Sequence, residues 1–559
     1  MALTRPPGVR TGPTLPERIE AGTHGRGGLR VVGSGPDERL SWTALYEQAC
    51  RAAAVLQARG VAPGQSVAVL GPTTMPLVIA LCALWLAGAT VVVLPLPMRM
   101  RSLEELVSQT RARLRACDAT LVLIDPQLGP LLEPAPGDPP AVALDELLER
   151  AGHVRPDRYA RPPADLDALA LLQFTSGSTA DPRGVMLSHR QLGANLDAIV
   201  AAIGLDADRD VAVSWLPLYH DMGLIGLLAT PLTVGTELVL SAPQAFLSQP
   251  GRWMELMSEH GGTVTAGPSF AYALAGRALH RSPALDLGRA RLVLNGSEPI
   301  DAASVEAFCR EAEPYHLDPR AMFCVYGLAE ATLAVSFPEV GTGMTTDAVS
   351  RPGLERDGRA RPPAGGEEAL RLVRLGRPLP GVELRVVDPG SGAPRAEREV
   401  GEVEVRGPSV TSGYYRNDSA TRSAFRDGWF RTGDLGYLAD GELVVCGRHK
   451  DVIIVGGRNV FPDDIERAAA ATGSVRAGNV VAFAGEPERG RTPVVVLAET
   501  RSEDHEATRR EVVRQVLDAV GLRARVVLLP PGALPKTSSG KLQRSLSRRR
   551  FLDDELPLL

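Results

Sequence analysis

Lysine is nearly missing from this sequence. Lysine and arginine together number 61 in 559 residues, and the only lysines are Lys450, Lys536 and Lys541. An arginine-rich composition explains the scarcity. It does not explain why two of the three occur in the segment Pro535-Lys536-Thr-Ser-Ser-Gly-Lys541. Because a compact ammonium and a planar guanidinium present their charge differently, lysine at these positions indicates a chemical requirement. Chance retention is the alternative.

Cysteine is also scarce and shows no metal-binding spacing. None of the six cysteines forms a C-x-x-C pair or a cysteine–histidine cluster, so neither a structural metal nor a disulfide framework is indicated. The first 20 residues lack the apolar core that a signal peptide requires. We therefore expect a cytoplasmic protein in a reducing compartment.

Long blocks of one charge are missing as well. The net charge is −5, and we interpret Arg548-Arg549-Arg550 as an exposed helix end, so nucleic acid is not an expected partner. With 44% apolar and 23% charged residues, the composition is that of a globular protein with an ample core. A chain of this length usually forms more than one domain.

One hydrophobic run approaches the length of a membrane span, at residues 75–97. Pro76, Gly88, Pro95 and Pro97 interrupt it. These breaks predict a buried helix at 76–86 and a buried strand at 90–94, and no membrane span.

Up to about residue 330, short β-branched runs alternate with amphipathic helical patterns. This alternation predicts parallel sheets covered by helices. The strands are expected at residues 66–70, 90–94, 120–124, 237–240, 263–266 and 291–294. Ser188 and Gln191 form a capping box for the next helix, and Gly204 ends it.

The remainder of the chain changes character twice. Residues 341–366 are rich in Gly, Pro, Arg and Glu, which indicates a surface insertion. Alternating strands at 383–387, 402–406 and 442–446 then predict an antiparallel subdomain. The final hundred residues predict a small α+β unit. Its first helix opens with Pro462 and two acids, and Gly473 follows it.

A hydroxyl-rich segment follows the apolar run 168–174. It consists of Thr175, Ser176, Gly177, Ser178 and Thr179. Backbone N–H groups and hydroxyls of such a loop can wrap a phosphate. The sequence contains no Walker motif, and the segment does not match the G-x-S-x-G pattern of a nucleophilic serine. Taken alone, an ordinary loop is the commoner outcome.

One histidine has an unusual setting, in Trp215-Leu-Pro-Leu-Tyr219-His220-Asp221-Met-Gly223. A lone histidine is usually structural. Next to an aromatic residue, and followed by an acid, His220 could instead gate a carboxylate pocket. Both interpretations stay open.

Two acids occur in motifs that suit a nucleotide. In Tyr326-Gly327-Leu-Ala-Glu330, the aromatic face suits adenine and the carboxylate suits Mg²⁺ bound to phosphates. In Arg431-Thr-Gly-Asp434, a turn carboxylate could accept both ribose hydroxyls. A core tyrosine, a surface glutamate and a plain turn are the alternatives.

The order and spacing of these motifs are more informative than any one of them. Together they resemble the adenylate-forming superfamily of acyl-CoA synthetases, peptide-synthetase adenylation domains and luciferases. The segments that carry the resemblance are TSGST…PRG, WLPLYHDMG, NGSEP (295–299), YGLAEAT, RTGD, GRHKD and LPKTSSGK. Within the superfamily, WLPLYHDMGLIG, GPSFAY, YGLAEATLAVS and the insertion are most similar to fatty-acyl-AMP ligases.

The resemblance implies an α/β fold with a large N-terminal domain of helix-covered sheets and an antiparallel β subdomain. A small, mobile α+β domain would follow. The expected boundaries are 1–447 and 448–559, with the hinge near Lys450.

The resemblance also implies a set of nucleotide-binding residues. Thr175, Ser176, Gly177, Ser178 and Thr179 would hold the ATP phosphates. Adenine would contact Asn295, Gly296, Ser297, Tyr326 and Gly327, and the ribose would contact Asp434. Arg448 would help to bind the nucleotide.

Catalytic roles would fall to Lys541, His220 and the magnesium ligand Glu330. A carboxylate that attacks the α-phosphate brings negative charges together, so Mg²⁺ and an ammonium must offset them. The later attack by a thiol requires the lysine to leave, which suits a lysine on a mobile domain.

Three positions depart from the family pattern. Arg183 stands where lysine is common in the phosphate loop, and Ala329 replaces a hydroxyl residue, a change that fatty-acyl-AMP ligases share. The segment Gly456-Gly457-Arg458-Asn459 combines the paired glycines of CoA ligases with the Arg-Asn of acyl-AMP ligases. This mixture leaves the thiol acceptor open.

Three functions therefore compete. The first is a fatty-acyl-AMP ligase that delivers its product to the phosphopantetheine of an acyl carrier protein or polyketide synthase. The second is a fatty-acyl-CoA ligase that uses free CoA, and the third is a non-catalytic nucleotide-binding protein. An amino-acid substrate is disfavoured, because no obvious residue would pair with an α-ammonium group. The insertion is either a disordered loop or a segment that packs on the large domain and limits the closure that CoA use requires.

Overall fold

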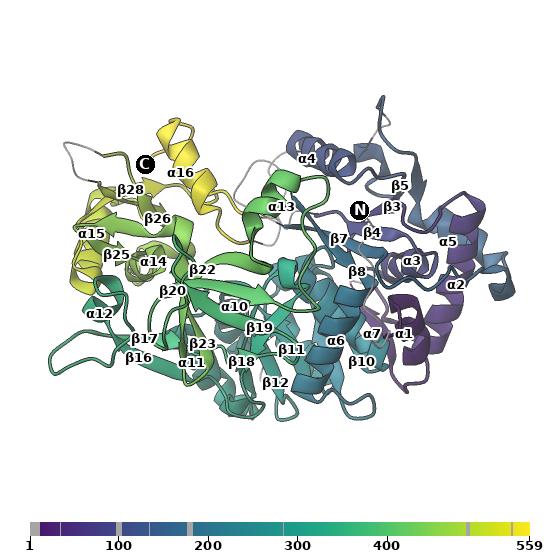
Figure 1. Cartoon of the computed structure of the whole chain (residues 1–559), viewed down its shortest axis with the longest axis horizontal. Coiled ribbons are helices and arrows are strands. Elements are labelled where there is room, and N and C mark those ends of the chain that lie inside the picture. Colours follow the sequence, from purple (N-terminus) through teal and green to yellow (C-terminus); the bar gives the residue numbers. More distant parts are fainter. Residues whose placement is uncertain are drawn as a thin grey trace.

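The structure is a computed structural model that describes residues 12–33, 35–96, 103–132, 135–175, 183–282, 284–487, 492–537 and 540–559. Colour in Figure 1 runs from the N-terminal elements at the right to the C-terminal elements at the upper left. The predicted α/β class is confirmed. Among the described residues, no helix has both the length and the apolar character needed to cross a bilayer.

The first large sheet carries most of the candidate residues. Within the described residues its order is β13–β12–β11–β9–β10–β1–β2. Its strands are β1 (Gly28–Val32), β2 (Glu38–Ser41), β9 (Val211–Ser214), β10 (Glu237–Ser241), β11 (Val264–Gly267), β12 (Leu292–Asn295) and β13 (Met322–Cys324). Neighbours pair in parallel except for β1 with β2. The three strands predicted in this region are confirmed with ends shifted by one residue.

The second large sheet has the order β6–β5–β3–β4–β7–β8 within the same described ranges. Its strands are β3 (Ser66–Leu70), β4 (Thr90–Val93), β5 (Leu121–Ile124), β6 (Ala141–Ala143), β7 (Leu169–Thr175) and β8 (Arg183–Ser188). Only the β7–β8 pair is antiparallel. The apolar run at 75–97 is a buried helix, α3 (Met75–Leu86), followed by β4, as predicted.

Helices cover both sheets (Figure 1). They are α1 (Leu15–Gly22), α2 (Trp42–Ala58), α4 (Leu103–Ala116), α5 (Leu144–Gly152), α6 (His189–Ile203), α7 (Thr230–Val234), α8 (Pro243–Ser248), α9 (Arg252–Glu259), α10 (Ser269–Ala278) and α11 (Ala302–Ala312). The predicted capping box of α6 is present: the Ser188 hydroxyl accepts from the Gln191 N–H, and Gln191 accepts from the Ser188 N–H. Gly204 ends the helix at φ +56°, in the left-handed region.

The predicted antiparallel subdomain is confirmed. It contains β19 (Glu383–Val387), β20 (Gly401–Arg406), β21 (Phe425–Arg426), β22 (Trp429–Ala439) and β23 (Glu442–Arg448). A small sheet of β14 (Tyr326–Gly327), β15 (Ala334–Phe337) and β18 (Arg377–Pro378) lies next to it in sequence, and α13 (Asp418–Ala424) precedes β21.

The insertion is not a disordered loop. Within residues 341–366, β16 (Thr346–Ser350) pairs with β17 (Ala369–Val373), and α12 (Arg351–Glu355) follows β16 directly. Val349, Leu354 and Ala360 are buried in one cluster with Tyr437 of β22. The composition suggested a surface segment because few residues there are apolar, but three of those few are buried while Ala348 and Ala364 are exposed.

The C-terminal residues form the predicted α+β unit. Its elements are β24 (Ile453–Val455), β25 (Arg458–Val460), α14 (Pro462–Ala470), β26 (Val475–Ala484), β27 (Val494–Thr500), α15 (His505–Val520), β28 (Ala524–Leu529) and α16 (Arg544–Leu552). Among the described residues, one hydrophobic cluster is built only from positions between Ile453 and Leu528. The domain boundary at 447/448 and the mobility of this unit stay predictions.

Candidate active site

The candidate residues gather at one edge of the first large sheet. Asn295 ends β12, Tyr326 lies two residues after β13, and His220 lies in the segment after β9. In open α/β sheets, ligands bind outside the carboxyl ends of parallel strands. The fold therefore brings together residues that are far apart in the sequence, at the place where such sheets bind ligands.

Tyr326, Asp434 and Arg448 form one polar chain. The Tyr326 hydroxyl donates to Oδ2 of Asp434 at 2.6 Å, and Nε of Arg448 donates to Oδ1 of the same carboxylate at 2.9 Å. Burial and the Asp434 charge raise the pKa of Tyr326, while Asp434 and Tyr326 raise the pKa of Arg448. The carboxylate is thus fixed in direction, as a hydrogen-bond acceptor for a sugar hydroxyl would have to be.

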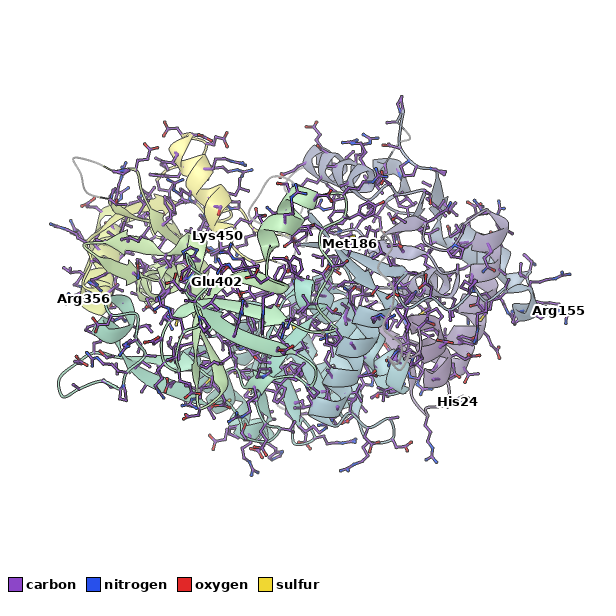
Figure 2. The ribbon with its side chains drawn as sticks, in the orientation of Figure 1. His24, Arg155, Met186, Arg356, Glu402 and Lys450 are labelled. Atoms are coloured by element: carbon purple, nitrogen blue, oxygen red, sulfur yellow. The ribbon has the colours of Figure 1, made fainter. Side chains whose placement is uncertain are left out.

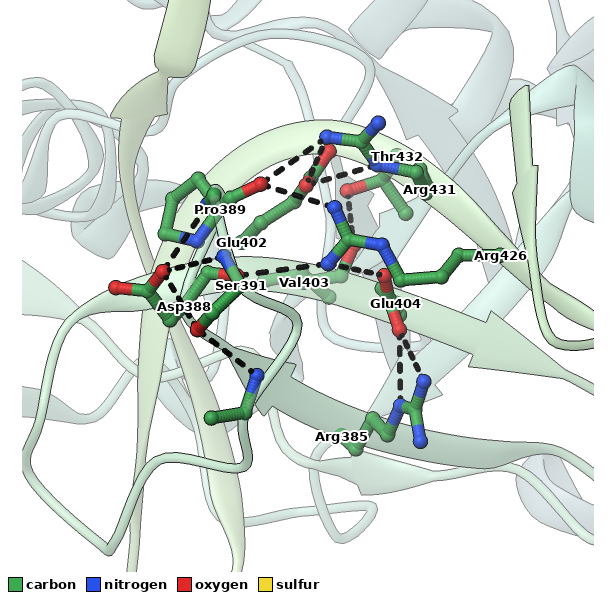
Figure 3. Close-up of polar contacts among 12 residues, drawn as sticks. Arg385, Asp388, Pro389, Ser391, Glu402, Val403, Glu404, Arg426, Arg431 and Thr432 are labelled. Carbon is green, nitrogen blue, oxygen red and sulfur yellow. Dashed lines mark hydrogen bonds and ion pairs between the residues drawn. The ribbon is translucent and has the colours of Figure 1, made fainter. Parts of the chain in front are cut away.

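The turn that presents Asp434 is anchored to β20 (Figure 3). Arg431 donates to Oε2 of the buried Glu402 at 2.7 Å, and the Thr432 hydroxyl donates to the carbonyl of Val403, also at 2.7 Å. The same Thr432 oxygen accepts from the backbone N–H of Asp434 at 3.0 Å. Arg431 and Thr432 of the R-T-G-D motif therefore both hold this turn in place.

A second buried carboxylate lies in the same network (Figure 3). Glu404 is 0% exposed and pairs with Arg385 at 2.7 Å, while Nη1 of Arg426 lies 3.6 Å from its other oxygen. The Arg426 and Arg431 guanidiniums both approach the carbonyl of Pro389. These contacts stabilise the sheet that carries the turn.

Glu330 is held from another direction. The Tyr414 hydroxyl donates to its Oε1 at 2.8 Å, and the guanidinium of Arg183 lies over the Tyr414 ring, 5.4 Å from its centre. Burial raises the pKa of Glu330, and the Tyr414 hydroxyl opposes that shift. Arg183 pairs across the β7–β8 ladder with Thr175, so the base of the phosphate loop is linked to this carboxylate.

The donor set around Glu330 fits magnesium. Mg²⁺ keeps several waters and takes one or two protein carboxylates together with phosphate oxygens. Within the described ranges, no group of three or more His, Cys, Asp or Glu side chains is placed to form an all-protein metal site. A single half-buried carboxylate near the predicted phosphate loop suits a Mg²⁺ ion that is also bound by phosphate.

His220 is bound by its neighbour. Its Nδ1 lies 2.6 Å from Oδ1 of Asp221, which also accepts from the Met222 N–H at 2.7 Å. Burial favours the neutral acid at Asp221, but the charges of His220 and Lys541 and the Met222 N–H outweigh it and lower its pKa. Because Nδ1 is engaged, Nε2 is the ring nitrogen that can face a ligand.

Lys541 lies in the same region although it belongs to the C-terminal unit. Burial lowers the pKa of its ammonium, and the charges of Asp221 and Glu298 oppose that shift. Glu298 is half-buried, burial raises its pKa, and its Oε1 accepts from the Phe270 N–H at 2.9 Å. The charge of the tail lysine therefore interacts with carboxylates from two segments of the large sheet edge.

The other predicted nucleotide-binding residues shape the backbone. A Cβ at Gly327 would lie 1.9 Å from the carbonyl oxygen of Leu333, and a Cβ at Gly296 would lie 2.9 Å from the Val325 side chain. Ser297 has φ +76°. Asn295 is fully buried, and its Nδ2 has no hydrogen-bond partner within the described part of the chain. Thr175 ends β7, whereas Ser176, Gly177, Ser178 and Thr179 lie outside the described residues.

Lys450, the predicted hinge, lies two residues after the end of β23. Figure 2 shows it where the antiparallel sheet leads into the C-terminal elements. Burial and Arg448 lower its pKa, whereas Asp451 and Asp434 act in the opposite sense. The hinge role itself stays a prediction.

The insertion contacts the C-terminal unit through ion pairs. Nε of Arg458 donates to Oε2 of the buried Glu355 at 2.8 Å, and Nη1 of Arg351 lies 3.3 Å from Oδ2 of Asp464. Because Glu355 and Arg351 belong to α12, the insertion is tied to residues on the far side of the predicted hinge.

Comparison with known proteins decides the family. A profile of the AMP-binding enzyme family matches residues 21–415. The chain belongs to the AMP-binding enzymes. The long-chain-fatty-acid–AMP ligase FadD26 of Mycobacterium marinum is 35% identical over 548 residues, which cover 92% of this chain and 92% of that protein.

Solved structures agree with the family assignment. A structure from a study of fatty acyl-adenylate ligases of E. coli and L. pneumophila matches with a TM-score of 0.91 and 31% identity, covering 97% of this chain and 98% of that one. The L. pneumophila ligase in complex with acyl adenylate and pyrophosphate matches with a TM-score of 0.75 and 28% identity, covering 98% and 97%. This AMP-binding enzyme is therefore an AMP-forming ligase that uses ATP, which overrides the non-catalytic alternative.

Three contacts of this AMP-binding enzyme were not expected from its sequence. Asp221 and Glu298 occur inside motifs that were noted, but nothing in the motifs indicates that both face Lys541. No sequence motif pointed to Tyr414, because its partner Glu330 is 84 residues away. Only the fold places these residues together.

Proposed function

We propose that this enzyme activates a fatty acid with ATP to an acyl-adenylate, releases pyrophosphate, and transfers the acyl group to a phosphopantetheine thiol. The acceptor would be an acyl carrier protein or a polyketide synthase. The observation that carries the proposal is the polar chain of Tyr326, Asp434 and Arg448 at the sheet edge. The charge of Lys541 also interacts with Asp221 and Glu298 in this region.

ATP would bind along the strand ends. Asp434, held by Tyr326 and Arg448, would accept hydrogen bonds from the ribose, and adenine would lie against the Tyr326 ring. The hydroxyl-rich segment that begins at Thr175 would hold the phosphates. Arg183, fixed at its far end on Tyr414, would add positive charge there.

The first half-reaction is an in-line displacement at the α-phosphate. A carboxylate oxygen of the fatty acid forms a bond to the α-phosphorus while the bond to pyrophosphate breaks. Negative charge grows on the transferred group, so the Lys541 ammonium would stabilise the transition state electrostatically. Its lowered pKa reflects burial, and Asp221 and Glu298 help to keep it protonated.

Glu330 would hold Mg²⁺, whose chemistry here is to offset charge on the phosphate oxygens. Tyr414 fixes one carboxylate oxygen by its hydrogen bond. The protein's own contribution is therefore to aim this half-buried carboxylate, whose pKa is raised by burial and lowered in part by the Tyr414 hydroxyl.

The acid would reach the α-phosphate past His220. A largely apolar crevice is lined by Tyr219, the residue before His220. A group of buried aromatic rings begins at Trp215 in the same segment. The apolar residues of the crevice are Leu77, Val93, Leu96, Pro217, Leu218, Tyr219 and Pro243. The stacked rings are Trp215 and Phe246, with Trp253 edge-on to both. The crevice has a volume of about 10 Å³ in this structure, so it would have to widen to take an alkyl chain. Its lining also includes Thr73 and Gln244 but, among the described residues, no acidic side chain that could pair with an α-ammonium group.

The contacts of the insertion provide the argument for the choice of thiol acceptor. Its ion pairs to Arg458 and Asp464 hold the C-terminal unit in the orientation that places Lys541 at the cleft. A unit held this way would turn less readily to receive free CoA. Transfer to a carrier protein, which can deliver its thiol on a long flexible arm, is therefore favoured.

A second candidate, a fatty-acyl-CoA ligase, is supported by Gly456 and Gly457. Both have positive φ, +58° and +77°, and a Cβ at either position would meet no heavy atom within 4 Å. Space of this kind could admit the narrow arm of CoA.

Pyrophosphate release across a fatty-acid series tests the proposal. The series is repeated with CoA and then with a phosphopantetheine-loaded carrier protein. We expect adenylate formation with fatty acids and acyl transfer to the carrier. Acyl-CoA that accumulates as fast as adenylate would favour the second candidate, and no pyrophosphate release with any fatty acid would reject both.

A further inference from the structure

Arg544 contacts three carboxylates inside the C-terminal unit. Its Nη1 donates to Oδ2 of Asp451 at 2.9 Å, its Nη2 donates to Oδ1 of Asp463 at 3.2 Å, and the same Nη2 lies 3.0 and 3.1 Å from the two oxygens of Glu466. Side-chain exposure is 21% for Arg544 and 11% for Asp451. A half-buried guanidinium that engages three acids fixes its own position in several directions at once.

The three acids come from two places, the proposed hinge and α14. Asp451 is the residue after Lys450, the proposed hinge, whereas Asp463 and Glu466 lie on successive turns of α14. Arg544 is the first residue of α16. The side chain therefore joins the start of α16 to the start of the C-terminal unit.

The segment that precedes Arg544 carries Lys541. It is closed by hydrogen bonds from the Thr537 N–H to the Lys541 carbonyl at 2.8 Å and from the Gln543 N–H to the Pro535 carbonyl at 3.0 Å. The Thr537 hydroxyl accepts from the Lys541 N–H at 3.1 Å. These bonds tie Lys541 and Gln543 to Pro535 and Thr537, so we expect the direction of Lys541 to depend on where this segment joins α16, at Arg544.

We propose that Arg544 is a positioning residue for Lys541, which fixes the lysine loop at a set place relative to the hinge through its pair with Asp451. Arg544 does not touch substrate and acts only through the loop. The inference rests on the proposed function in one respect, namely that Lys541 serves adenylate formation. Reacting groups misplaced by about 1 Å can lose a hundredfold in rate.

The chain offers a matched control on the same helix. Arg548 donates from Nε to the carbonyl of Ala484 at 3.1 Å and has no carboxylate partner among the described residues. Arg544→Met and Arg548→Met remove the same charge from the same helix. Arg544→Lys keeps a positive charge but cannot reach all three acids, and Asp451→Asn breaks only the contact at the hinge.

The first readout is adenylate formation measured by pyrophosphate release. We expect Arg544→Met to lower kcat at least 30-fold with KM for ATP within threefold, Arg544→Lys to recover at least fivefold of that loss, and Asp451→Asn to lower kcat three- to tenfold. Arg548→Met should stay within twofold. Equal losses in the two methionine variants, or a loss that appears mainly in KM, would overturn the inference.

The second readout does not depend on activity. Because the chain has only three lysines, the acetylation rate of each amine can be followed separately by peptide mapping. In Arg544→Met, Lys541 should react at least fivefold faster than in the wild type, with Lys450 changed less than twofold. An unchanged Lys541 rate would overturn the inference even if the variant were inactive.

Failure of the proposed function would look different. Lys541→Ala would then retain adenylate formation, while the acetylation rates would still report whether Arg544 positions the loop.

Discussion

The hydroxyl of Tyr326 donates a hydrogen bond of 2.6 Å to Asp434, a residue 108 positions further along the chain. Tyr326 follows the last strand of the parallel sheet, and Asp434 lies on β22 of the antiparallel subdomain. The bond therefore joins the two parts of the large domain at the proposed nucleotide site.

Tyr326→Phe should raise KM for ATP about tenfold or more with little change in kcat. The ring that we propose to face adenine is retained, but Asp434 loses a donor, and hydrogen bonds to charged groups contribute about 1.5–3 kcal/mol. Tyr437→Phe is the control, because its hydroxyl donates to the buried Asp347 at 2.8 Å in the insertion. Initial rates over a range of ATP concentrations measure both. A control variant with the same rise in KM would contradict the prediction.

Lys541→Ala should lower adenylate formation about 10²- to 10³-fold, as expected when a charge that stabilises a transition state is removed. Lys536→Ala, in the same loop, should lose less than fivefold. The assay is pyrophosphate release under saturating ATP. If both variants lost activity equally, the loop rather than the ammonium at 541 would be what matters.

Arg385→Met should destabilise the protein by about 3 kcal/mol, because it leaves the buried Glu404 with only the more distant Arg426. Arg406→Met provides a close comparison: both arginines lie over the Trp429 ring, at 4.3 and 4.5 Å, but the acid partner of Arg406 is exposed. Thermal unfolding should show a much smaller shift for Arg406→Met. Equal shifts would mean that the stacking on Trp429 dominates.

Glu466 should make stability depend on pH. Burial raises the pKa of Glu466 to about 7. The charge of Asp463 adds to this shift, whereas the charge of Arg544, which also binds Asp451, opposes it. A raised folded pKa means that the stabilisation is complete below the ordinary value of 4.5 and is lost as pH rises to about 7, on the order of 3 kcal/mol in total.

Glu466→Gln cannot ionise and should remove this dependence. Melting temperatures at pH 5 and pH 8 test it: the wild type should lose stability relative to the variant at the higher pH. The exposed Glu506→Gln serves as the control. A wild-type-minus-variant difference that is the same at both pH values would contradict the assignment.

Glu355→Gln combined with Arg458→Met should raise acyl-CoA formation relative to adenylate formation. The pair joins the insertion to the C-terminal unit, and removing both charges avoids leaving one of them buried and unpaired. The ratio of the two products with saturating CoA is the measurement. A ratio within twofold of the wild type would show that this contact does not restrict the acceptor.

Regular elements could be predicted from the sequence because their signals are local. The strand at 66–70, the capping box of Ser188 and Gln191, and the stop at Gly204 each depend on residues within a few positions of one another. The insertion is a surface segment as predicted, but its composition could not show which elements cover its buried side. Its buried Val349 and Leu354 are covered by Tyr437, which lies far along the chain.

Site residues could be named from motifs, but their partners could not. The sequence suggested roles for Glu330 and Lys541 through the family resemblance. It could not show that Tyr414 holds the first or that Asp221 faces the second, because both contacts join distant segments. Such contacts depend on how sheets and domains pack, and no local pattern records that.

Asp434 and Arg448 occupy facing positions on the β22–β23 ladder, and Lys450 follows two residues later. The proposed sugar-binding carboxylate thus belongs to a hairpin that ends two residues before the proposed pivot. If the C-terminal unit rotates at Lys450, a nucleotide that binds one orientation of the unit more tightly must shift the population toward that orientation. By thermodynamic reciprocity, fixing the C-terminal unit in one orientation must then change the affinity for that nucleotide by the same factor.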